Sequence, residues 1–235
     1  MQIRVGTSGY SYKEWKGSFY PEDLKSADML RSYAERFTSV EINNTFYRMP
    51  KATMLEGWAG QVPSDFRFVL KASQQITHRK RLKDAGEPVA YLLETAATLG
   101  ERLGPVLFQL PPYLKKDVGR LRDFLALLPD GRPFAFEFRH DSWSTDEVHD
   151  ALHERNCALV CADTEDSGEE GARIVSTADW GYLRLRRCDY TPAELRPWTD
   201  RIRSQPWERA FVFFKHEEAR PLAWETIRRF KDELV

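Results

Sequence analysis

The chain has 235 residues, 42% of them hydrophobic, and a formal net charge of −1. These values exclude a disordered tail and argue against a strongly basic nucleic-acid-binding domain. The length suits one large domain, and no Pro-, Gly- or Ser-rich linker divides the chain, so we expect a single domain over residues 1–235. No run approaches the roughly 18 to 20 apolar residues of a membrane span, and the expected location is the cytoplasm.

Eight extended apolar runs are predicted to be strands. Segments with helical periodicity, such as Asp28–Phe37, separate most of them, and Thr191–Glu194 has the pattern of a capping box. The acidic crossover Thr164–Trp180 is expected to hold a loop or short strand in place of a helix. Eight strands alternating with helices predict an α/β fold, a single (β/α)₈ TIM-type barrel. The predicted strands are Ile3–Gly6, Ser39–Asn43, Phe66–Ala72, Val106–Leu110, Pro133–Phe138, Ala158–Asp163, Tyr182–Arg186 and Phe211–Lys215.

The fifth predicted strand alternates most clearly. Phe134, Phe136 and Phe138 share one face, whereas Glu137 and Arg139 lie on the other. If the phenylalanines pack against helices, the charged pair points into the barrel, where burial without a partner is costly. This pattern is typical of an active site built at strand ends.

The same alternation, applied to the other strands, predicts a cluster of polar side chains at the carboxyl ends. Barrel enzymes carry their sites on that face. The alternative is a structural network of ion pairs that fills the barrel. The predicted cluster comprises Ser8, Glu41, Asn43, Lys71, Gln109, Glu137, Arg139, Asp163, Arg184, Arg186, Lys215 and His216.

Four ordered segments resemble the signatures of a known family: Gly6–Tyr10 with Trp15, Val40–Arg48, Phe108–Pro112 and Glu137–Trp143. By these segments the chain is similar, over nearly its whole length, to the YecE-like proteins, or domain of unknown function 72. The resemblance implies a TIM-type barrel with a polar cavity at the strand carboxyl ends. It implies no activity, because none is assigned to the family.

Acid–base chemistry is the expected activity. Glu137 is the first candidate for the acid or base and Glu41 the second, provided that the cavity separates their pKa values. Lys71 and Asp163 complete the predicted catalytic set. Aromatic side chains near the rim, Trp143 among them, would suit stacking on a sugar or base, although packing at the rim is an equal alternative. The predicted substrate-binding residues are Ser8, Asn43, Gln109, Arg139, His140, Trp143, Arg184 and Lys215.

Cations outnumber acids in the predicted site, which favours a small anionic ligand such as a phosphorylated or carboxylated metabolite. The expected reaction is that of a lyase, isomerase or hydrolase. A binding protein without catalysis would share the same pocket. The basic run His78–Lys83 leaves a further alternative open, a nucleic-acid-binding protein or nuclease that contacts phosphates.

No cofactor is expected. The chain lacks a Gly-rich dinucleotide or phosphate-binding fingerprint and a Gly-x-Ser-x-Gly elbow. A divalent metal, as in a metal-dependent hydrolase, stays open because the site has the ligand types for it, although not their usual spacing. The three cysteines form no CxxC pair and are expected to be reduced thiols. The metal candidates are Glu41, Glu137, His140, Asp163 and His216, and the cysteines are Cys157, Cys161 and Cys188.

Overall fold

The structure of the protein, a computed structural model, describes residues 1–168, 171–187, 190–215 and 221–234. Cys188 and His216 lie outside the described residues. Within these residues, eight parallel strands form one sheet in the order β1-β8-β7-β6-β5-β4-β3-β2. The strands are β1 (Gln2–Thr7), β2 (Ser39–Ile42), β3 (Arg67–Lys71), β4 (Leu103–Gln109), β5 (Phe134–Glu137), β6 (Ala158–Asp163), β7 (Trp180–Leu185) and β8 (Arg209–Phe214).

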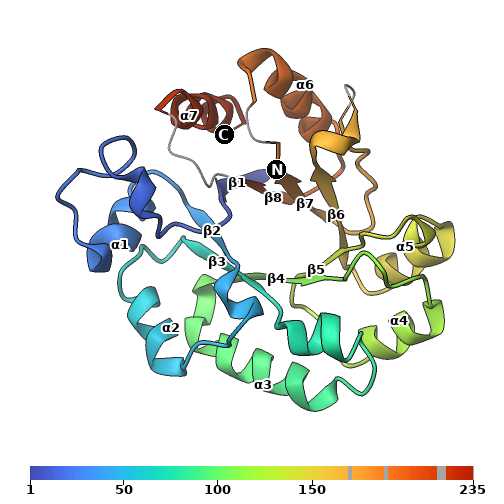
Figure 1. Cartoon of the computed structure of the whole chain (residues 1–235). Coiled ribbons are helices and arrows are strands. Elements are labelled where there is room, and N and C mark those ends of the chain that lie inside the picture. The colour runs from blue at the N-terminus through green and yellow to red at the C-terminus, as the bar shows by residue number, and fades with distance from the viewer. Residues whose placement is uncertain (169–170, 188–189, 216–220, 235) are drawn as a thin grey trace.

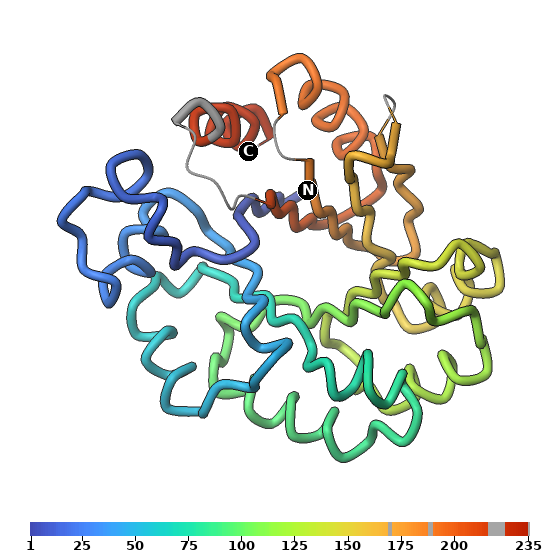
Figure 2. The backbone as a smooth tube through the Cα atoms, in the orientation of Figure 1, coloured from blue at the N-terminus to red at the C-terminus, as the bar shows by residue number. Residues whose placement is uncertain are grey.

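The predicted TIM-type barrel is confirmed. The chain passes round the ring in sequence order, so that its first and last strands pair (Figure 2). β1 and β2, the ends of the strand order, meet through a parallel bridge between Ser8 and Glu41. Each predicted strand matches one of the eight, although the fourth begins three residues earlier than predicted, at Leu103, and the seventh and eighth begin two residues earlier, at Trp180 and Arg209.

The α-helices lie outside the ring of strands (Figure 1). The capping box at α6 is confirmed, because Thr191 and Glu194 exchange both of its hydrogen bonds. In the described part of the crossover between β6 and β7, the helical structure is a single 3₁₀ turn, Glu165–Ser167. The α-helices are α1 (Met29–Ala34), α2 (Ala52–Ala59), α3 (Gly86–Ala96), α4 (Val118–Leu125), α5 (Asp146–His153), α6 (Pro192–Arg203) and α7 (Pro221–Leu234).

Short helical turns follow several strands at their carboxyl ends. Two of them matter for the site: the 3₁₀ helix η3 (Asn44–Phe46) after β2 and the π-helix η4 (Gln75–Arg79) after β3. A third, η6 (Asp141–Trp143), follows β5. No helix among the described residues is long and apolar enough to cross a membrane.

The interior of the barrel has an apolar layer beneath a polar one. Large side chains such as Trp180, Phe211 and Phe213 fill the apolar layer. Two residues further along the same strands, the inward positions become polar: Val69 is followed by Lys71. In the same way Leu107 precedes Gln109, Ala135 precedes Glu137 and Tyr182 precedes Arg184. Alternation along each strand therefore sets the polar layer at the carboxyl-terminal mouth.

Gly6 marks the closest approach of β1 to β2. A Cβ atom added there would lie 2.0 Å from the backbone oxygen of Ser39. Backbone cannot yield as a flexible side chain does, so closure of the barrel requires glycine at this position.

We expect Gly6→Ala to lower the free energy of unfolding by at least about 3 kcal/mol, because the added methyl group forces β1 and β2 apart. Urea denaturation at pH 7 would measure the change. Gly57→Ala in α2 is the matched control, since a Cβ there meets nothing within 4 Å. It should stabilise the protein by about 0.5 to 1 kcal/mol through helix propensity. A wild-type urea midpoint for Gly6→Ala would show that closure tolerates a wider strand spacing.

Candidate functional site

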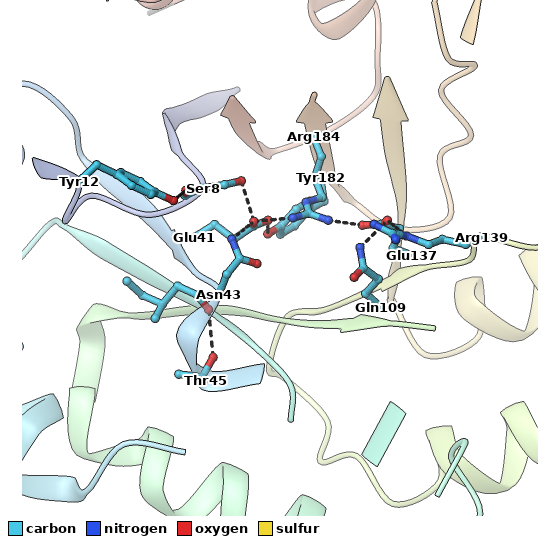
Figure 3. A network of polar contacts seen from close by, with 11 residues as sticks. Ser8, Tyr12, Glu41, Asn43, Thr45, Gln109, Glu137, Arg139, Tyr182 and Arg184 are labelled. Atoms are coloured by element: carbon cyan, nitrogen blue, oxygen red, sulfur yellow. Dashed lines mark hydrogen bonds and ion pairs between the residues drawn. The ribbon is translucent and has the colours of Figure 1, made fainter. Parts of the chain in front are cut away.

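Two buried carboxylates share one guanidinium inside the barrel mouth. Arg184 on β7 lies between Glu41 on β2 and Glu137 on β5 (Figure 3). Its two terminal nitrogens donate to Glu41 Oε1 at 2.8 Å and to Glu137 Oε2 at 2.6 Å. All three residues are at most 3% exposed. The two carboxylates therefore share one buried cation, and the three groups together bear one net negative charge.

Polar neighbours occupy the remaining positions on Glu41. Ser8 Oγ and Asn43 Nδ2 donate to Oε1 at 2.8 Å and 3.0 Å, and the Tyr182 hydroxyl donates to Oε2 at 2.7 Å. Burial alone would raise the pKa of Glu41, but the charge of Arg184 and these hydrogen bonds outweigh it and lower the pKa. Glu41 is thus ionised at neutral pH.

Glu137 is held in a similar way. Gln109 Nε2 donates to Oε1 at 2.6 Å from the next strand, where the two residues are register partners. Arg139 Nε donates to the same oxygen at 3.0 Å. Burial opposes ionisation, yet the charges of Arg184 and Arg139 lower the pKa of Glu137 to about 2. The environment therefore lowers the pKa values of both carboxyl groups, so that both are ionised at neutral pH.

Tyr182 is a member of the network that the sequence did not single out. It lies on the inward face of β7, two residues before Arg184, and its hydroxyl donates to Glu41 Oε2. Burial and the charge of Glu41 raise its pKa well above the usual value. Its position two residues before Arg184 could have identified it as an inward-facing residue. The predicted strand began at Tyr182, however, so no preceding residue showed on which face Tyr182 lies.

Lys71 lies at the carboxyl end of β3, half-buried, with Nζ 4.3 Å from the centroid of the Phe46 ring. Burial and the positive charges of Arg184 and Arg139 lower its pKa to about 8, against the opposing effect of Glu137 and Glu41. Among the described residues, Lys71 Nζ forms no hydrogen bond or ion pair.

Arg186 follows β7 and belongs to the same charged group. Burial and then the charge of Arg184 lower its pKa, with a further contribution from Arg139. Lys215 directly follows β8, where its backbone N–H donates to Leu185 O at 2.9 Å.

Three predicted site residues lie apart from the network around Arg184. Asp163 faces the helices, where it pairs with Arg187 at 2.8 Å and accepts from the Tyr190 hydroxyl at 2.7 Å. Trp143 is 2% exposed; its Nε1 donates to Leu114 O. His140 Nδ1 accepts from the backbone N–H of Ser142 and caps η6.

Trp143 also stacks on Phe138, with the ring planes 9° apart and the centroids 4.5 Å apart. Its indole therefore packs beneath the rim. Of the two roles that the sequence left open for the rim aromatics, ligand stacking or packing, Trp143 has the packing role in this structure. The stack explains why Phe138 and Trp143 occur together after β5.

The candidate ligands for the divalent metal that the sequence left open are not grouped as a metal site in the described residues. Asp163 and His140 lie away from Glu41 and Glu137, and His216 is outside the described part of the chain. Within that part, no three His, Cys, Asp or Glu side chains are grouped so as to hold a metal ion. Cys157 and Cys161 are buried free thiols whose pKa burial raises to about 12.

A ring of eight parallel strands with a charged network at its carboxyl-terminal mouth defines a TIM-type barrel protein with its candidate site in the usual position. Residues 4–235 match the family described as Protein of unknown function DUF72, and the chain belongs to that family. The resemblance seen in the four sequence segments is thereby confirmed.

Two curated relatives carry names without an activity. UPF0759 protein YecE of Escherichia coli K12 is 30% identical over 168 residues, which cover 69% of this chain and 59% of YecE. UPF0759 protein YunF of Bacillus subtilis 168 is 31% identical over 150 residues, 60% of this chain and 52% of YunF. The matches thus span little more than half the length of these relatives.

Solved structures agree on the fold. A DUF72 family protein from Thermotoga maritima superposes with a TM-score of 0.85 at 28% identity, over 100% of this chain and 99% of that one. A DUF72 family protein from Enterococcus faecalis V583 has a TM-score of 0.77 at 20% identity, over 99% of this chain and 97% of that one.

Replacing Arg184 tests the charged network. We expect Arg184→Met to lower the free energy of unfolding at pH 7 by about 3 to 5 kcal/mol, because it leaves two buried carboxylates without a counter-charge. Arg122→Met is the control: it removes a surface pair with Glu154 and should change stability little.

The pH dependence of unfolding shows whether the stability loss in Arg184→Met comes from unpaired charge. In the wild type the folded pKa of Glu137 is below its unfolded value, so its stabilisation is present above about pH 4.5 and is lost as pH falls towards 2. In Arg184→Met, burial raises the carboxyl pKa values, and protonation should restore stability as pH falls below them. Urea denaturation at pH 7 and pH 4.5 would show the deficit shrinking in acid; an equal deficit at both would contradict a charge effect.

Proposed function

We propose that the barrel mouth binds a small anionic metabolite, and that the protein performs metal-independent acid–base chemistry on it, as a lyase, isomerase or hydrolase does. The observation that carries the proposal is the positive charge around the central network. Glu41, Arg184 and Glu137 together bear one net negative charge, whereas Lys71, Arg139 and Arg186 add three positive ones. A bound anion would relieve the repulsion among these cations.

The proton-transfer role falls to Lys71 in this proposal. General acid–base catalysis is most effective when the pKa of the group lies near the working pH, and the pKa of Lys71 is about 8. Glu137, with a pKa of about 2, is a weak base at neutral pH. The sequence favoured Glu137 and Glu41 for this role; we assign them instead to holding Arg184.

The recognition roles change as well. Ser8, Asn43 and Gln109 donate their side-chain hydrogen bonds to the carboxylates, so in this proposal they position the network and do not contact the metabolite. Arg139 is an exposed residue of the site. Its side chain is 42% accessible, and it donates a hydrogen bond to Glu137 through Nε alone. Its terminal nitrogens suit the bidentate recognition of phosphate or carboxylate.

Anion binding can be measured before any substrate is known. Inorganic phosphate, compared with chloride at equal ionic strength, should raise the unfolding temperature of the wild type, and stabilisation reaches about 2.7 kcal/mol at a hundredfold excess over Kd. Lys71→Met and Arg139→Met should each lose most of this stabilisation. Lys25→Met, which removes an exposed lysine from the same chain, is the charge-matched control. A wild type indifferent to phosphate, sulfate and carboxylates would remove the basis of the proposal.

Lys71→Arg separates an enzyme from a binding protein. Arginine keeps the positive charge but does not release its proton at neutral pH, so the variant should still bind phosphate yet lose turnover. Solvent deuterium incorporation into small phosphorylated and carboxylated metabolites, followed by NMR, would report proton abstraction from carbon by a lyase or isomerase. Hydrolysis products in the same spectra would report a hydrolase. Exchange that persists undiminished in Lys71→Arg would contradict the role of Lys71.

A further inference from the structure

The turns after two neighbouring strands meet on one aromatic ring at the barrel mouth. Phe46, the last residue of η3 after β2, contacts Lys71 Nζ at 4.3 Å and the His78 ring at 4.8 Å, in a T-shaped arrangement. These two distances place His78 within about 9 Å of the Lys71 ammonium. A residue taken from the sequence as part of a surface basic run thus lies beside the candidate site.

The position of His78 is fixed by its backbone. It belongs to the π-helix η4, a rare form that is frequent at functional sites. Three residues with positive φ follow within six positions: Arg81 (52°), Leu82 (68°) and Asp84 (49°). Leu82 is 3% exposed, and its N–H donates to Ile76 O at 3.0 Å. The buried Leu82 anchors this strained turn, which holds the histidine in place.

The side chain of His78 is oriented as well. Its Nδ1 lies 2.9 Å from the hydroxyl of Thr77, which is fully buried. That contact occupies one ring nitrogen and leaves Nε2 for another partner. An imidazole held by an aromatic contact and by one nitrogen is a preorganised binding group, not a freely rotating surface side chain.

We propose that His78 is a further anion-binding residue of this site, and that it makes the site selective for a doubly charged, phosphate-type group by taking up a proton when such a group binds. The inference rests on the proposed function, because it assumes that Lys71 and Arg139 bind an anion. The inference goes beyond the proposed function because it names a phosphate-type dianion as the ligand class and adds His78 to the site.

The charges around His78 explain the selectivity. Burial, and then the positive charges of Lys71 on β3 and Arg139 after β5, lower its pKa, so the imidazole is neutral at pH 7 in the free protein. A dianion offsets those cations and restores the pKa, and the protonated ring then adds a charge-assisted hydrogen bond. A monoanionic carboxylate supplies half the charge and therefore less of this gain.

Calorimetric titration with sulfate tests the proposal. Sulfate stays a dianion between pH 5 and 9, so any proton exchanged with buffers of different ionisation enthalpy comes from the protein. The wild type should take up protons in two ranges, one near the ordinary histidine pKa of about 6.5 and one near pH 8 from Lys71. His78→Gln should lose the acidic range only and bind sulfate roughly fivefold more weakly at pH 6.

Two further variants keep the test decisive. His78→Arg, with a fixed positive charge, should bind sulfate at pH 6 without proton uptake in the acidic range. His153→Gln, at an exposed histidine of α5, is the matched control and should behave as the wild type. Thermal unfolding of each variant verifies that the fold is retained.

Failure of the inference about His78 can be distinguished from failure of the proposed function. If His78→Gln keeps the acidic proton uptake and its sulfate affinity, the inference about His78 is overturned while the anion site stands. If sulfate binds neither the wild type nor any variant, the proposed function fails, and the inference with it.

Discussion

The arginine shared by two carboxylates is the interaction on which the rest of the site depends. Charges in a barrel interior are costly unless each is compensated. Arg184 meets that requirement for Glu41 and Glu137 together, and neighbouring side chains fill the remaining hydrogen-bond positions. Because the two carboxylates are committed to this cation, they are poor proton acceptors at neutral pH. The proposed function therefore assigns reactivity to the cations around the network.

The apolar layer beneath the network strengthens this effect. Trp180, Phe211 and Phe213 fill the barrel below the polar residues, so the charges rest on a close-packed floor of low polarisability. At a given distance, Coulomb interactions are stronger in such surroundings than in water. This explains why Arg184 and Arg139 influence the pKa of Lys71, and why Lys71 and Arg139 in turn influence that of His78.

Strand alternation predicted the barrel and its inner network because each step of one residue reverses the face of the side chain. Glu41, Gln109, Glu137 and Arg184 all occur where this rule placed them. The rule was misapplied at Asp163. β6 reads Ala-Leu-Val-Cys-Ala-Asp, apolar on both faces, and its composition does not reveal that Cys161 and Asp163 share the helix-facing side.

The residues of the turns were less predictable. His78 begins a basic run that reads as a solvated loop, and no periodicity signals a π-helix that turns it towards Phe46. Trp143 seemed a rim aromatic because it is close to the strand end in sequence. Its partners, Leu114 and Phe138, belong to two different strand–helix connections, and only tertiary packing brings them together.

A buried ion network is weak evidence for stability, because well-packed apolar side chains of similar volume are often as stabilising. Apolar side chains, however, cannot supply an oriented electrostatic field. Glu41 and Glu137 fix the guanidinium of Arg184 from two sides of the barrel. Burial lowers the pKa of Lys71, and the charge of Arg184 lowers it further, against the opposing charges of Glu137 and Glu41. The proposed function therefore depends on the position of this fixed charge and not on the stability that the network adds to the barrel.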